Sequence, residues 1–468
     1  MKNIHKKILG LAILTSVFTA CDKNIDLQPT DTISTETAIQ TYDDLDRAAI
    51  GAYSNIAYQQ SIAVNSSLAD EARYGADNST RNYYLEARWL YDSTDGGQNS
   101  SWENLYNVID RVNRALSRYD DVTTSTPTEA ANKPRLRGEL LAIRAFAHAE
   151  LLRWFSAKYE PSALGVVLKL QSSILEKPQR NTFGEVMAQV NADLAEADAL
   201  IPSSSTDLFR ITKPAVAAIR ARAALYAKDW ANAALYAGQA IAAKPTLATG
   251  ATYSGIWTDA NTSEVLFQLR RNANAGSVRT IYTDDNLDVF LSPSYKLLAT
   301  YNQLTDIRYP AFFFNDRSVA TSREPWKVNK YPGQTATNRF NNVKVFRTSE
   351  MYLILAEAQA ELNDLSSGAS SLNAVRAARI TGYVPVTTFT KQELIDAILL
   401  ERYKELAFEG HRFFDLKRRE LPVVRGDQDI TVGAAVPKTL SVTDRQYALP
   451  IPSTELFANP NIQQNPGY

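Results

Sequence analysis

Pairs of helical stretches with small residues between them constrain the fold of this chain more than any other feature. In 214–243, apolar and small residues recur at intervals of three and four before and after a turn at 228–230. Such intervals are typical of α-helices that pack one face against a neighbour. A second pair occupies 347–380, with its turn at 363–364. The chain is therefore expected to stack helical hairpins.

The same periodicity recurs through the first half of the chain. Its spacing is not strictly regular, so we predict a mainly all-α fold built on tetratricopeptide-like helical pairs rather than a uniform solenoid. Prolines after two of the stretches are expected to end those helices. The further helices predicted are 36–58, 101–119, 136–159 (before Pro161) and 183–200 (before Pro202).

Residues 245–345 depart from this pattern. Gly, Asn, Asp, Thr and aromatic residues dominate there, and 265–269 has the composition of a short strand. A long irregular insert in a helical scaffold is usually functional or disordered, and its aromatic content argues against disorder. We therefore expect a helical scaffold at 36–244, an irregular functional insert at 245–345 and a C-terminal part at 346–468.

The first 20 residues are typical of a secretion signal. Three lysines precede an apolar run at 8–18, which is too short to span a bilayer as a mature helix. The small residues Thr19 and Ala20 suit a signal-peptidase cut before Cys21, although Phe18 is bulkier than the usual lipobox residue. The cut would expose a thiol that can carry lipid, and 21–35 would form a polar tether.

Cys21 is the single cysteine among 468 residues. No disulfide can therefore form within the chain, although exported proteins often contain them. An ordinary signal peptide followed by a stray cysteine is the alternative interpretation. We expect a lipid anchor with acyl chains such as palmitate, because stable anchoring takes two or more chains.

Charge and histidine content argue against several functions. Lys and Arg total 50 while Asp and Glu total 51, whereas a nucleic-acid binder shows a basic excess. No second apolar run approaches the ~18 residues that cross a membrane. Outside the signal only His148 and His411 remain, so a catalytic triad or a His-rich metal site is hard to build. The sequence predicts no cofactor and no nucleic-acid partner.

The most distinctive segment is 393–419, ELIDAILLERYKELAFEGHRFFDLKRR, which we predict to be one amphipathic helix with a charged face. Its pattern Glu-Arg-x-x-Glu-Leu-x-Phe-Glu-Gly-x-Arg-x-x-Asp-Leu-x-Arg resembles the signature of the RagB/SusD family of nutrient-binding outer-membrane lipoproteins. The pattern is carried by Glu401, Arg402, Glu405, Leu406, Phe408, Glu409, Gly410, Arg412, Asp415, Leu416 and Arg418.

Three further segments resemble the family in the same order along the chain. WENLYNVIDRVNRAL is similar to its early helix, RTSEMYLILAEAQAEL with LNAVRAAR to its helical pair, and LPIPSTELFANPNIQQNPGY to its C-terminus. We expect the last residue, Tyr468, to dock on the fold rather than fray.

The resemblance implies a function and an architecture. It implies a surface-exposed, lipid-anchored outer-membrane protein of Bacteroidota-type bacteria that binds oligosaccharides, or in some members peptides. It also implies delivery of the ligand to a SusC-like TonB-dependent transporter, and no enzymatic activity. The tetratricopeptide-like helices would face the transporter, and the insert at 245–345 would carry the ligand site.

The acidic residues of the signature raise the alternative of a surface glycosidase. That chemistry needs two carboxylates about 5–10 Å apart across a cleft, one with a raised pKa. Here acidic and basic residues alternate at helical spacings of three and four, which predicts ion pairs. We therefore expect Glu401, Glu405, Glu409 and Asp415 to form a structural ion network.

Other conspicuous residues are also expected to be structural. His148 lies on an apolar helical stripe, and His411 lies within the charged signature. Trp102 and Trp230 lie on helical stripes and are expected in the core.

An acidic loop is a weak candidate for calcium. Asp284, Asp285 and Asp288 could offer oxygen ligands, but the loop lacks the glycine and the distal glutamate of an EF-hand. Acidic loop residues are usually solvated, which is the interpretation we favour.

Two aromatic stretches are the candidate ligand sites, and the family resemblance implies the same two regions. Aromatic rings suit the apolar face of a sugar, while Asn, Asp or Arg suits its hydroxyls. Pro325 and Pro332 disfavour a helix between them, so those rings are expected on a loop. Each ring alone is also compatible with core packing, because aromatic residues are mostly buried. The candidates are Trp326, Tyr331, Arg323 and Asn329 beside Lys327, and Trp89, Tyr83, Tyr84 and Tyr91 near Asn78, Arg81, Asn82 and Asp92.

We thus predict a protein that captures a glycan fragment without chemistry and releases it rapidly. A peptide ligand stays open, because the two stretches are not overwhelmingly aromatic. A lipid on Cys21 would hold the protein in the membrane of its transporter and raise the effective concentration of the pair.

Overall fold

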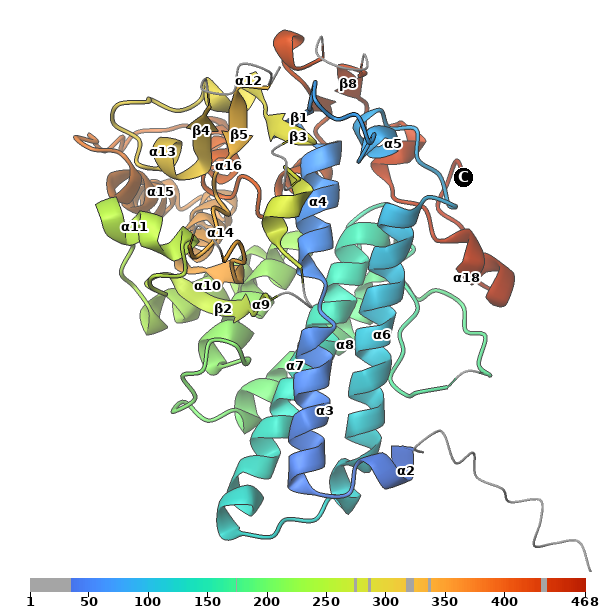
Figure 1. The fold of residues 1–468 in the computed structure, drawn as a ribbon. Helices are drawn as coiled ribbons and strands as arrows, with labels where there is room; N and C mark the ends of the chain where they lie inside the picture. Colours follow the sequence, from blue (N-terminus) through green and yellow to red (C-terminus); the bar gives the residue numbers. More distant parts are fainter. Residues whose placement is uncertain are drawn as a thin grey trace, which may run out of the picture.

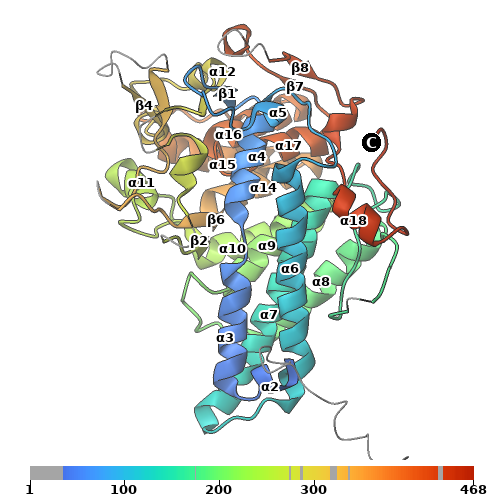
Figure 2. The same ribbon diagram turned by 45° about the vertical axis from the view of Figure 1, so that its right-hand side comes forward.

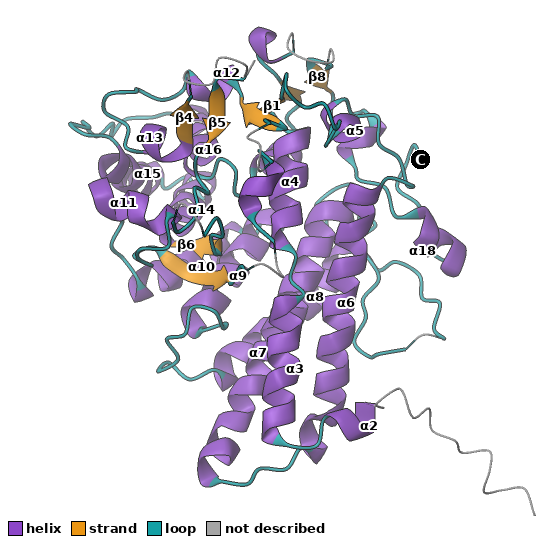
Figure 3. Ribbon diagram, viewed as in Figure 1, coloured by secondary structure: helices purple, strands orange, loops and turns teal. Residues whose placement is uncertain are grey.

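Long helices dominate the fold, and the strands are few and short (Figure 1, Figure 3). The mainly all-α prediction is therefore confirmed. Cys21, the signal and the tether up to residue 34 lie outside the described residues. The computed structural model describes 35–173, 175–272, 276–284, 288–316, 324–335, 338–430 and 436–468.

The first long helix differs from its prediction. The predicted single helix at 36–58 is wrong, because the chain bends at 55–57 between α3 (Tyr42–Ser54) and α4 (Tyr58–Leu68). A capping box begins α3: the Thr41 hydroxyl accepts from the Asp44 amide, and the Asp44 carboxylate accepts from the Thr41 amide. Such reciprocal bonds satisfy amides that a helix start leaves open.

The next helices extend the scaffold beside α3 and α4 (Figure 1, Figure 2). α6 spans Gly96–Arg118 and packs on α7, which spans Pro127–Phe155. The predicted bounds 136–159 are wrong for α7, because Thr126 caps it earlier and it ends before Pro161 is reached. α8 (Phe183–Leu200) packs on α7 and has the predicted bounds.

Both predicted helical hairpins are confirmed. They are α9 (Lys213–Tyr226) with α10 (Trp230–Ala243), and α14 (Thr348–Glu361) with α15 (Leu365–Arg379). In each hairpin a left-handed residue makes the turn, and the aspartate after it caps the second helix. α10 also packs against α14, so the hairpins stack although the insert separates them in sequence.

The signature segment is not one helix, which corrects the prediction for 393–419. α16 spans Lys391–Glu405. A turn at 406–411 follows, and α17 spans Arg412–Arg418. Gly410 in that turn has φ +86°, and a Cβ there would lie 3.2 Å from the Ser61 carbonyl carbon of α4. A glycine therefore permits both the turn and its close approach to α4.

Half of the described strands lie wholly in the insert, and the strands form four antiparallel pairs among the described residues. The predicted strand at 265–269 is confirmed as β2, and it pairs with β6 at the start of the C-terminal part. The pairs are β1 (Ala72–Tyr74) with β3 (Leu291–Pro293), β2 (Val265–Leu269) with β6 (Val343–Arg347), β4 (Phe313–Asn315) with β5 (Trp326–Val328), and β7 (Val423–Val424) with β8 (Thr439–Leu440).

None of the described helices is both long and apolar enough to cross a membrane. Short helices connect the elements named above. The remaining ones are α2 (Thr35–Ala38), α5 (Tyr84–Ala87), α11 (Gly250–Trp257), α12 (Tyr295–Leu298), α13 (Arg308–Phe312) and α18 (Ser453–Ala458), with 3₁₀ turns η1 (Tyr119–Asp121), η2 (Val278–Ile281), η3 (Asp427–Asp429) and η4 (Arg445–Tyr447).

One large apolar core runs from Ile39 to Ile462 and includes residues of the scaffold, the insert and the C-terminal part. A smaller core lies between α14, α15 and α16. The tail is fixed to the scaffold, because the Asn465 amide donates to the carbonyls of Phe155 at 2.8 Å and Leu449 at 2.7 Å. Tyr468 docks as predicted, with the Arg445 guanidinium 4.8 Å from its ring centre.

Candidate ligand-binding site

A buried ion network lies beneath the insert, centred on Glu405 of the signature. Its carboxylate contacts Arg347 and Arg379 at 3.0 Å and Arg308 at 3.2 Å. Burial raises the pKa of Glu405, but these guanidinium groups outweigh burial and hold the pKa well below its usual range. The predicted ion network is confirmed, although it lies in the interior rather than on a solvated helix face.

The other signature acids are neutralised in the same way. Glu401 contacts Arg308 at 2.6 Å and Arg376 at 2.8 Å, and Asp415 accepts from Arg402 and Arg418. Each of these carboxylates carries a lowered pKa, because its arginines outweigh burial. The broken helix explains the arrangement, since α16 and α17 bring acids and arginines toward each other from two directions.

The turn between α16 and α17 holds a loop of the insert. Lys330 donates to Glu409 at 2.7 Å and to the Ala407 carbonyl at 2.7 Å, and the Tyr331 hydroxyl donates to the Phe408 carbonyl at 2.9 Å. Lys330 and Tyr331 are consequently buried. The signature thus positions the polypeptide that follows β5.

The four residues expected to be structural lie in or against the core. His148 is buried, accepts from the Lys169 amide at 3.3 Å through Nε2, and donates from Nδ1 to the Arg144 carbonyl at 3.1 Å. His411 and Trp102 are also buried, whereas Trp230 is half-buried against the core. The predictions for His148, His411 and Trp102 are confirmed.

The pair of β4 and β5 carries the start of the first candidate stretch, so Trp326 lies on a strand rather than on the predicted loop, whereas Tyr331 lies in the loop after β5 as predicted. Phe314 pairs directly with Lys327, and Asn315 pairs with Trp326. Directly paired residues share a face, and successive residues alternate between faces. Phe314 and Lys327 therefore point to one side of the hairpin, and Trp326 points to the other.

A groove opens on the Phe314 side of the hairpin. Two hollows of about 240 and 450 Å³ adjoin there, since Arg279 and Thr283 line both. We call this the insert groove. Its principal lining residues are Arg279, Thr283, Asp284, Phe314, Asp316, Lys327, Asn329, Tyr331, Arg339 and Phe340.

The insert groove combines one exposed ring with polar groups of both charges. Phe314 is 50% exposed, whereas the neighbouring Phe313 is buried. The Lys327 ammonium lies 3.3 Å from the Asp316 carboxylate. The backbone amide of Asn329 donates to the Phe312 carbonyl at 2.8 Å, which fixes this residue beside the groove. An apolar ring beside amide, carboxylate and guanidinium groups is an arrangement that can bind a polyhydroxylated ring.

The structure divides the first group of predicted site residues. Asn329 and Tyr331 line the groove, but the Tyr331 ring is buried and packs at 6.3 Å, edge to face, on Trp257. Trp326 does not line it, because its ring packs at 6.0 Å against Tyr309 on the opposite face of the hairpin. Arg323 lies outside the described residues.

The second predicted group lies near β5 but contributes no groove residue. Trp89 and Tyr91 are buried, which corrects their assignment as ligand platforms: Trp89 donates to the Leu68 carbonyl and Tyr91 to the Gln446 carbonyl. Tyr83 and Tyr84 are half-buried, and Tyr84 packs edge to face on Tyr74 of β1 at 6.2 Å.

The two predicted regions nevertheless lie toward the same end of the molecule, with β1 and β3 between them (Figure 1). Arg73 of β1 forms a buried ion pair with Glu324, and the Ser292 hydroxyl of β3 donates to the Trp326 carbonyl at 2.9 Å. β3 thus lies between β1 and β5.

Several groove residues were missed in the sequence, notably Phe314, Arg279 and Arg339. The signal for Phe314 was present in the run 312–314, where three phenylalanines precede a polar residue. Alternation along a short strand places the middle ring inside and the last one outside. No comparable signal marks Arg279 or Arg339, which reach the groove through tertiary contacts.

The acidic loop shows no described metal site. Asp284 Oδ1 accepts from the Asp288 amide at 2.8 Å, and Asp285 lies outside the described residues. Within the described ranges, no group of three or more His, Cys, Asp or Glu side chains could hold a metal ion.

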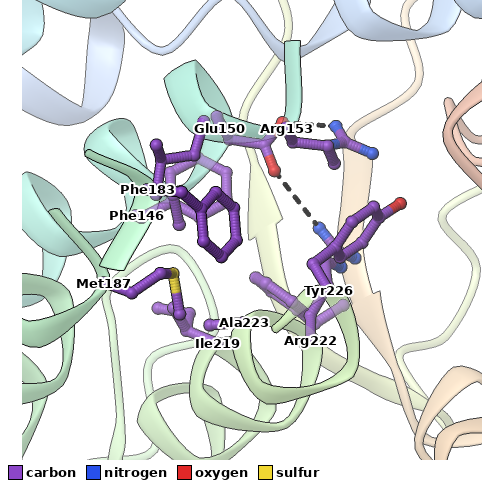
Figure 4. A pocket seen from close by; sticks show the side chains of 12 residues that line it. Phe146, Glu150, Arg153, Phe183, Met187, Ile219, Arg222, Ala223 and Tyr226 are labelled. Atoms are coloured by element: carbon purple, nitrogen blue, oxygen red, sulfur yellow. Dashed lines mark hydrogen bonds and ion pairs between the residues drawn. The ribbon is translucent and has the colours of Figure 1, made fainter. Parts of the chain in front are cut away.

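A separate hollow inside the scaffold is too small for a sugar (Figure 4). It lies among α7, α8 and α9, where Glu150 forms ion pairs with Arg153 and, at 4.0 Å, with Arg222. Its accessible space of about 20 Å³ suits a single water molecule. The Tyr226 side chain lines it as well, with its hydroxyl turned away from the centre of the hollow (Figure 4).

Comparison with known families matches most of the chain. Residues 318–468 match the SusD family, and residues 22–225 match a family described as starch-binding and associating with the outer membrane. The two matches cover the signature, the tail and the helical scaffold as far as α9.

Curated relatives and solved structures agree with the family matches. SusD-like protein P38 of Formosa agariphila is 22% identical over the whole chain and 99% of its own length, and SusD-like protein P2 of the same organism is 31% identical over 34% of each chain. A SusD superfamily protein of Bacteroides thetaiotaomicron is 25% identical, with a TM-score of 0.80 over 91% of this chain and all of its own. A candidate sugar-binding protein of Bacteroides vulgatus is 27% identical, with a TM-score of 0.79 over 92% of this chain and all of its own.

Proposed function

The chain belongs to the SusD family, and we propose that it is a lipid-anchored outer-membrane protein that binds oligosaccharides in the insert groove and delivers them to a SusC-like TonB-dependent transporter. The description of the second matching family, starch-binding and associating with the outer membrane, supports both the ligand class and the location.

The single observation that carries the ligand class is the exposure of Phe314 in a polar groove. A half-exposed aromatic ring costs free energy in water, and it recovers that free energy when an apolar face covers it. A sugar offers such a face together with hydroxyls that the amide of Asn329 and the carboxylate of Asp316 can reach. The open groove suits weak, multi-contact capture followed by fast release.

The state of the signature carboxylates supports binding without chemistry. A glycosidase needs a carboxylic acid of raised pKa that faces its partner across a cleft. The signature acids have lowered pKa values and are occupied by arginines. Burial raises the pKa of Glu71 to about 7, but its oxygens accept from Ser66, Asn65 and the Phe408 amide inside the core.

A binding screen tests the proposal. The full chain, purified in detergent, is titrated with neutral oligosaccharides from starch and other polysaccharides, and with peptides of similar length. We expect saturable binding of at least one oligosaccharide. Phe314→Ala should weaken it about tenfold, because the lost ring contact is worth about 1.4 kcal/mol.

Phe457→Ala is the matched control, because Phe457 is 87% exposed on α18 and does not line the insert groove. It should leave oligosaccharide affinity unchanged. Saturable binding of peptides but of no oligosaccharide would replace the ligand class with the peptide alternative. Hydrolysis of any bound glycan, abolished by one carboxylate substitution, would overturn binding without chemistry.

A further inference from the structure

A second pocket lies away from the insert groove, between the scaffold and the C-terminal tail. It encloses about 350 Å³, which is within the size range of small-ligand sites. The segment after α7, the turn between α9 and α10, α17 and the tail around η4 form its walls. The lining residues are Ala157, Lys158, Tyr159, Lys228, Lys417, Arg418, Glu420, Val442, Thr443, Asp444, Arg445, Tyr447, Ala448 and Pro466.

Basic residues predominate in this tail pocket. It is lined by five basic side chains and two acidic ones, Glu420 and Asp444. Glu420 lies 3.8 Å from Lys228, and both side chains are exposed. Arg418 is neutralised away from the pocket by Glu357 and Asp415. Positive charge therefore remains on Lys158, Lys417 and Arg445, against the one exposed carboxylate of Asp444, which accepts from the Ser441 amide at 2.7 Å.

Lys417 is the informative residue of the three. Its side chain is 5% exposed, and no ion pair to it is found in the described structure. Burial and, to a smaller extent, the nearby Arg180 together lower the pKa of Lys417 to about 7, with no acidic group acting in the opposite direction. Buried charges are normally paired, because an unpaired one is costly to desolvate.

Hydrogen bonds to the end of α7 account for only part of the environment of the buried Lys417 ammonium. The Lys417 ammonium donates to the Ser156 carbonyl at 2.6 Å and the Trp154 carbonyl at 3.4 Å, next to the C-terminal end of α7. Carbonyl groups there attract a cation through their dipoles. They satisfy two of its three N–H groups and supply no formal negative charge. The Tyr159 ring centre lies 5.2 Å from the same ammonium and also favours a cation without supplying formal charge. A buried ammonium with no formal counter-charge consequently borders an open pocket.

The remaining walls suit the body of a small ring. Tyr447 and Tyr159 are buried aromatic residues, while Val442 is 42% exposed and Ala448 half-buried. Arg445 is exposed beside Tyr468, and Lys158 is exposed as well. The pocket thus offers aromatic and apolar surface together with one buried and two exposed cations.

We propose that the tail pocket binds an anionic monosaccharide unit, with its carboxylate or sulfate group against Lys417 and within reach of Arg445 and Lys158. The assignment goes beyond glycan capture in the insert groove, because it involves different residues at a different place in the fold. Uronic acids and sulfated sugars share the required chemistry, a compact oxyanion on a sugar ring.

Calorimetric titration of the full chain in detergent tests the assignment. The probes are sodium glucuronate, glucose 6-sulfate, neutral glucose and inorganic sulfate. We expect one or both sugar anions to bind saturably and more tightly than either glucose or sulfate alone. Affinity should fall above pH 7, by up to about tenfold per pH unit, as the Lys417 ammonium loses its proton.

Two variants separate binding from folding. Lys417→Met should weaken sugar-anion binding about thirtyfold. Because this residue is buried, the exposed double variant Lys158→Ala/Arg445→Ala is measured as well, and it should weaken binding about fivefold with an unchanged unfolding transition. Lys438→Ala, an exposed lysine outside the pocket, is the matched control and should have no effect.

Three results of these titrations would contradict binding of a sugar anion in the tail pocket. Equal affinity for glucose and the sugar anions, or unchanged affinity in the double variant, would overturn the proposal. Inorganic sulfate binding as tightly as the sugar anions would also overturn it, because the sugar ring would then contribute nothing. Any of these results would leave capture of neutral glycans in the insert groove unaffected, since none of its residues is altered.

Discussion

Lys330 and Glu409 form a buried ion pair in which Nζ and Oε1 lie 2.7 Å apart. Glu409 belongs to the turn between α16 and α17, and Lys330 lies between the groove residues Asn329 and Tyr331. The same carboxylate accepts from Arg347 of β6 at 2.6 and 2.8 Å. One carboxylate therefore joins the signature turn, the insert groove and the strand that leads into α14.

Glu409→Gln should destabilise the protein by about 3 kcal/mol, because it leaves the buried Lys330 without its counter-charge and removes one of the three carboxylates around Arg347. The free energy of unfolding is measured in urea at pH 7. The matched control is Glu196→Gln, which removes a carboxylate paired with Arg137 at the surface and should cost less than about 1 kcal/mol. Similar costs for both variants would contradict a structural role for the buried network.

Gly410→Ala tests whether the turn requires glycine. The left-handed backbone alone costs about 1–2 kcal/mol for alanine, and the new Cβ would also press on the backbone of Ser61 and Ile62 at 3.2–3.3 Å. Gly382→Ala is the matched control, since Gly382 has φ +73° and no atom within 4 Å of an added Cβ. The unfolding free energy should fall further for Gly410→Ala than for Gly382→Ala. Equal losses would show that the close approach to α4 has no energetic weight.

His148 should make stability depend on pH. Burial lowers its pKa to about 3 in the folded protein, against about 6.5 when unfolded. The unfolded chain therefore binds the extra proton first, and stability falls as pH drops below 6.5, by about 1.4 kcal/mol per pH unit from this residue. Between pH 7 and pH 5, His148→Gln should lose about 2 kcal/mol less unfolding free energy than the unmodified protein.

Urea unfolding of both proteins at the two pH values measures this difference. Burial and the nearby Arg222 also lower the pKa of His411. Because His411 is present in both proteins, its contribution to the pH dependence cancels from the comparison. An unchanged pH dependence in His148→Gln would mean that His148 takes up its proton within the folded state.

The helical hairpins could be predicted because their signal is local. In α9, α10, α14 and α15 the apolar period, the turn residues and the capping aspartates all lie within about 30 consecutive residues. The break after Glu405 could not be predicted in this way. It depends on left-handed Phe408 and on the contact of Gly410 with α4, which tertiary structure alone provides.

The candidate site was harder to predict than the fold. Composition identified the region around 326–331, but the choice of ring depends on the face to which each residue of β5 points. Pairing with β4 places Phe314 in the groove and Trp326 outside it. Trp89 and Tyr91 have the same composition signal, yet hydrogen bonds to Leu68 and Gln446 hold them in the core.

Cys21→Ser tests the proposed lipid anchor. The substitution removes the thiol that would carry lipid and leaves the described fold untouched. Oligosaccharide affinity of the purified protein should be unchanged, whereas uptake of the same glycan by cells should fall, because the pair with the transporter loses its shared membrane. Uptake is measured with labelled glycan, beside a Ser34→Ala control in the same N-terminal region. Full uptake by the Cys21→Ser cells would show that the anchor is dispensable.

Trp326→Ala and Phe314→Ala should have opposite consequences although the two residues lie on neighbouring strands. Trp326 packs on Tyr309, so its truncation should cost about 2 kcal/mol of unfolding free energy and leave oligosaccharide affinity within about twofold. Phe314 is exposed, so its truncation should leave the unfolding free energy within about 0.5 kcal/mol while affinity falls. Calorimetry and urea unfolding on both variants provide the comparison. A large loss of affinity in Trp326→Ala alone would place the ligand on the other face of the hairpin, beside Tyr309.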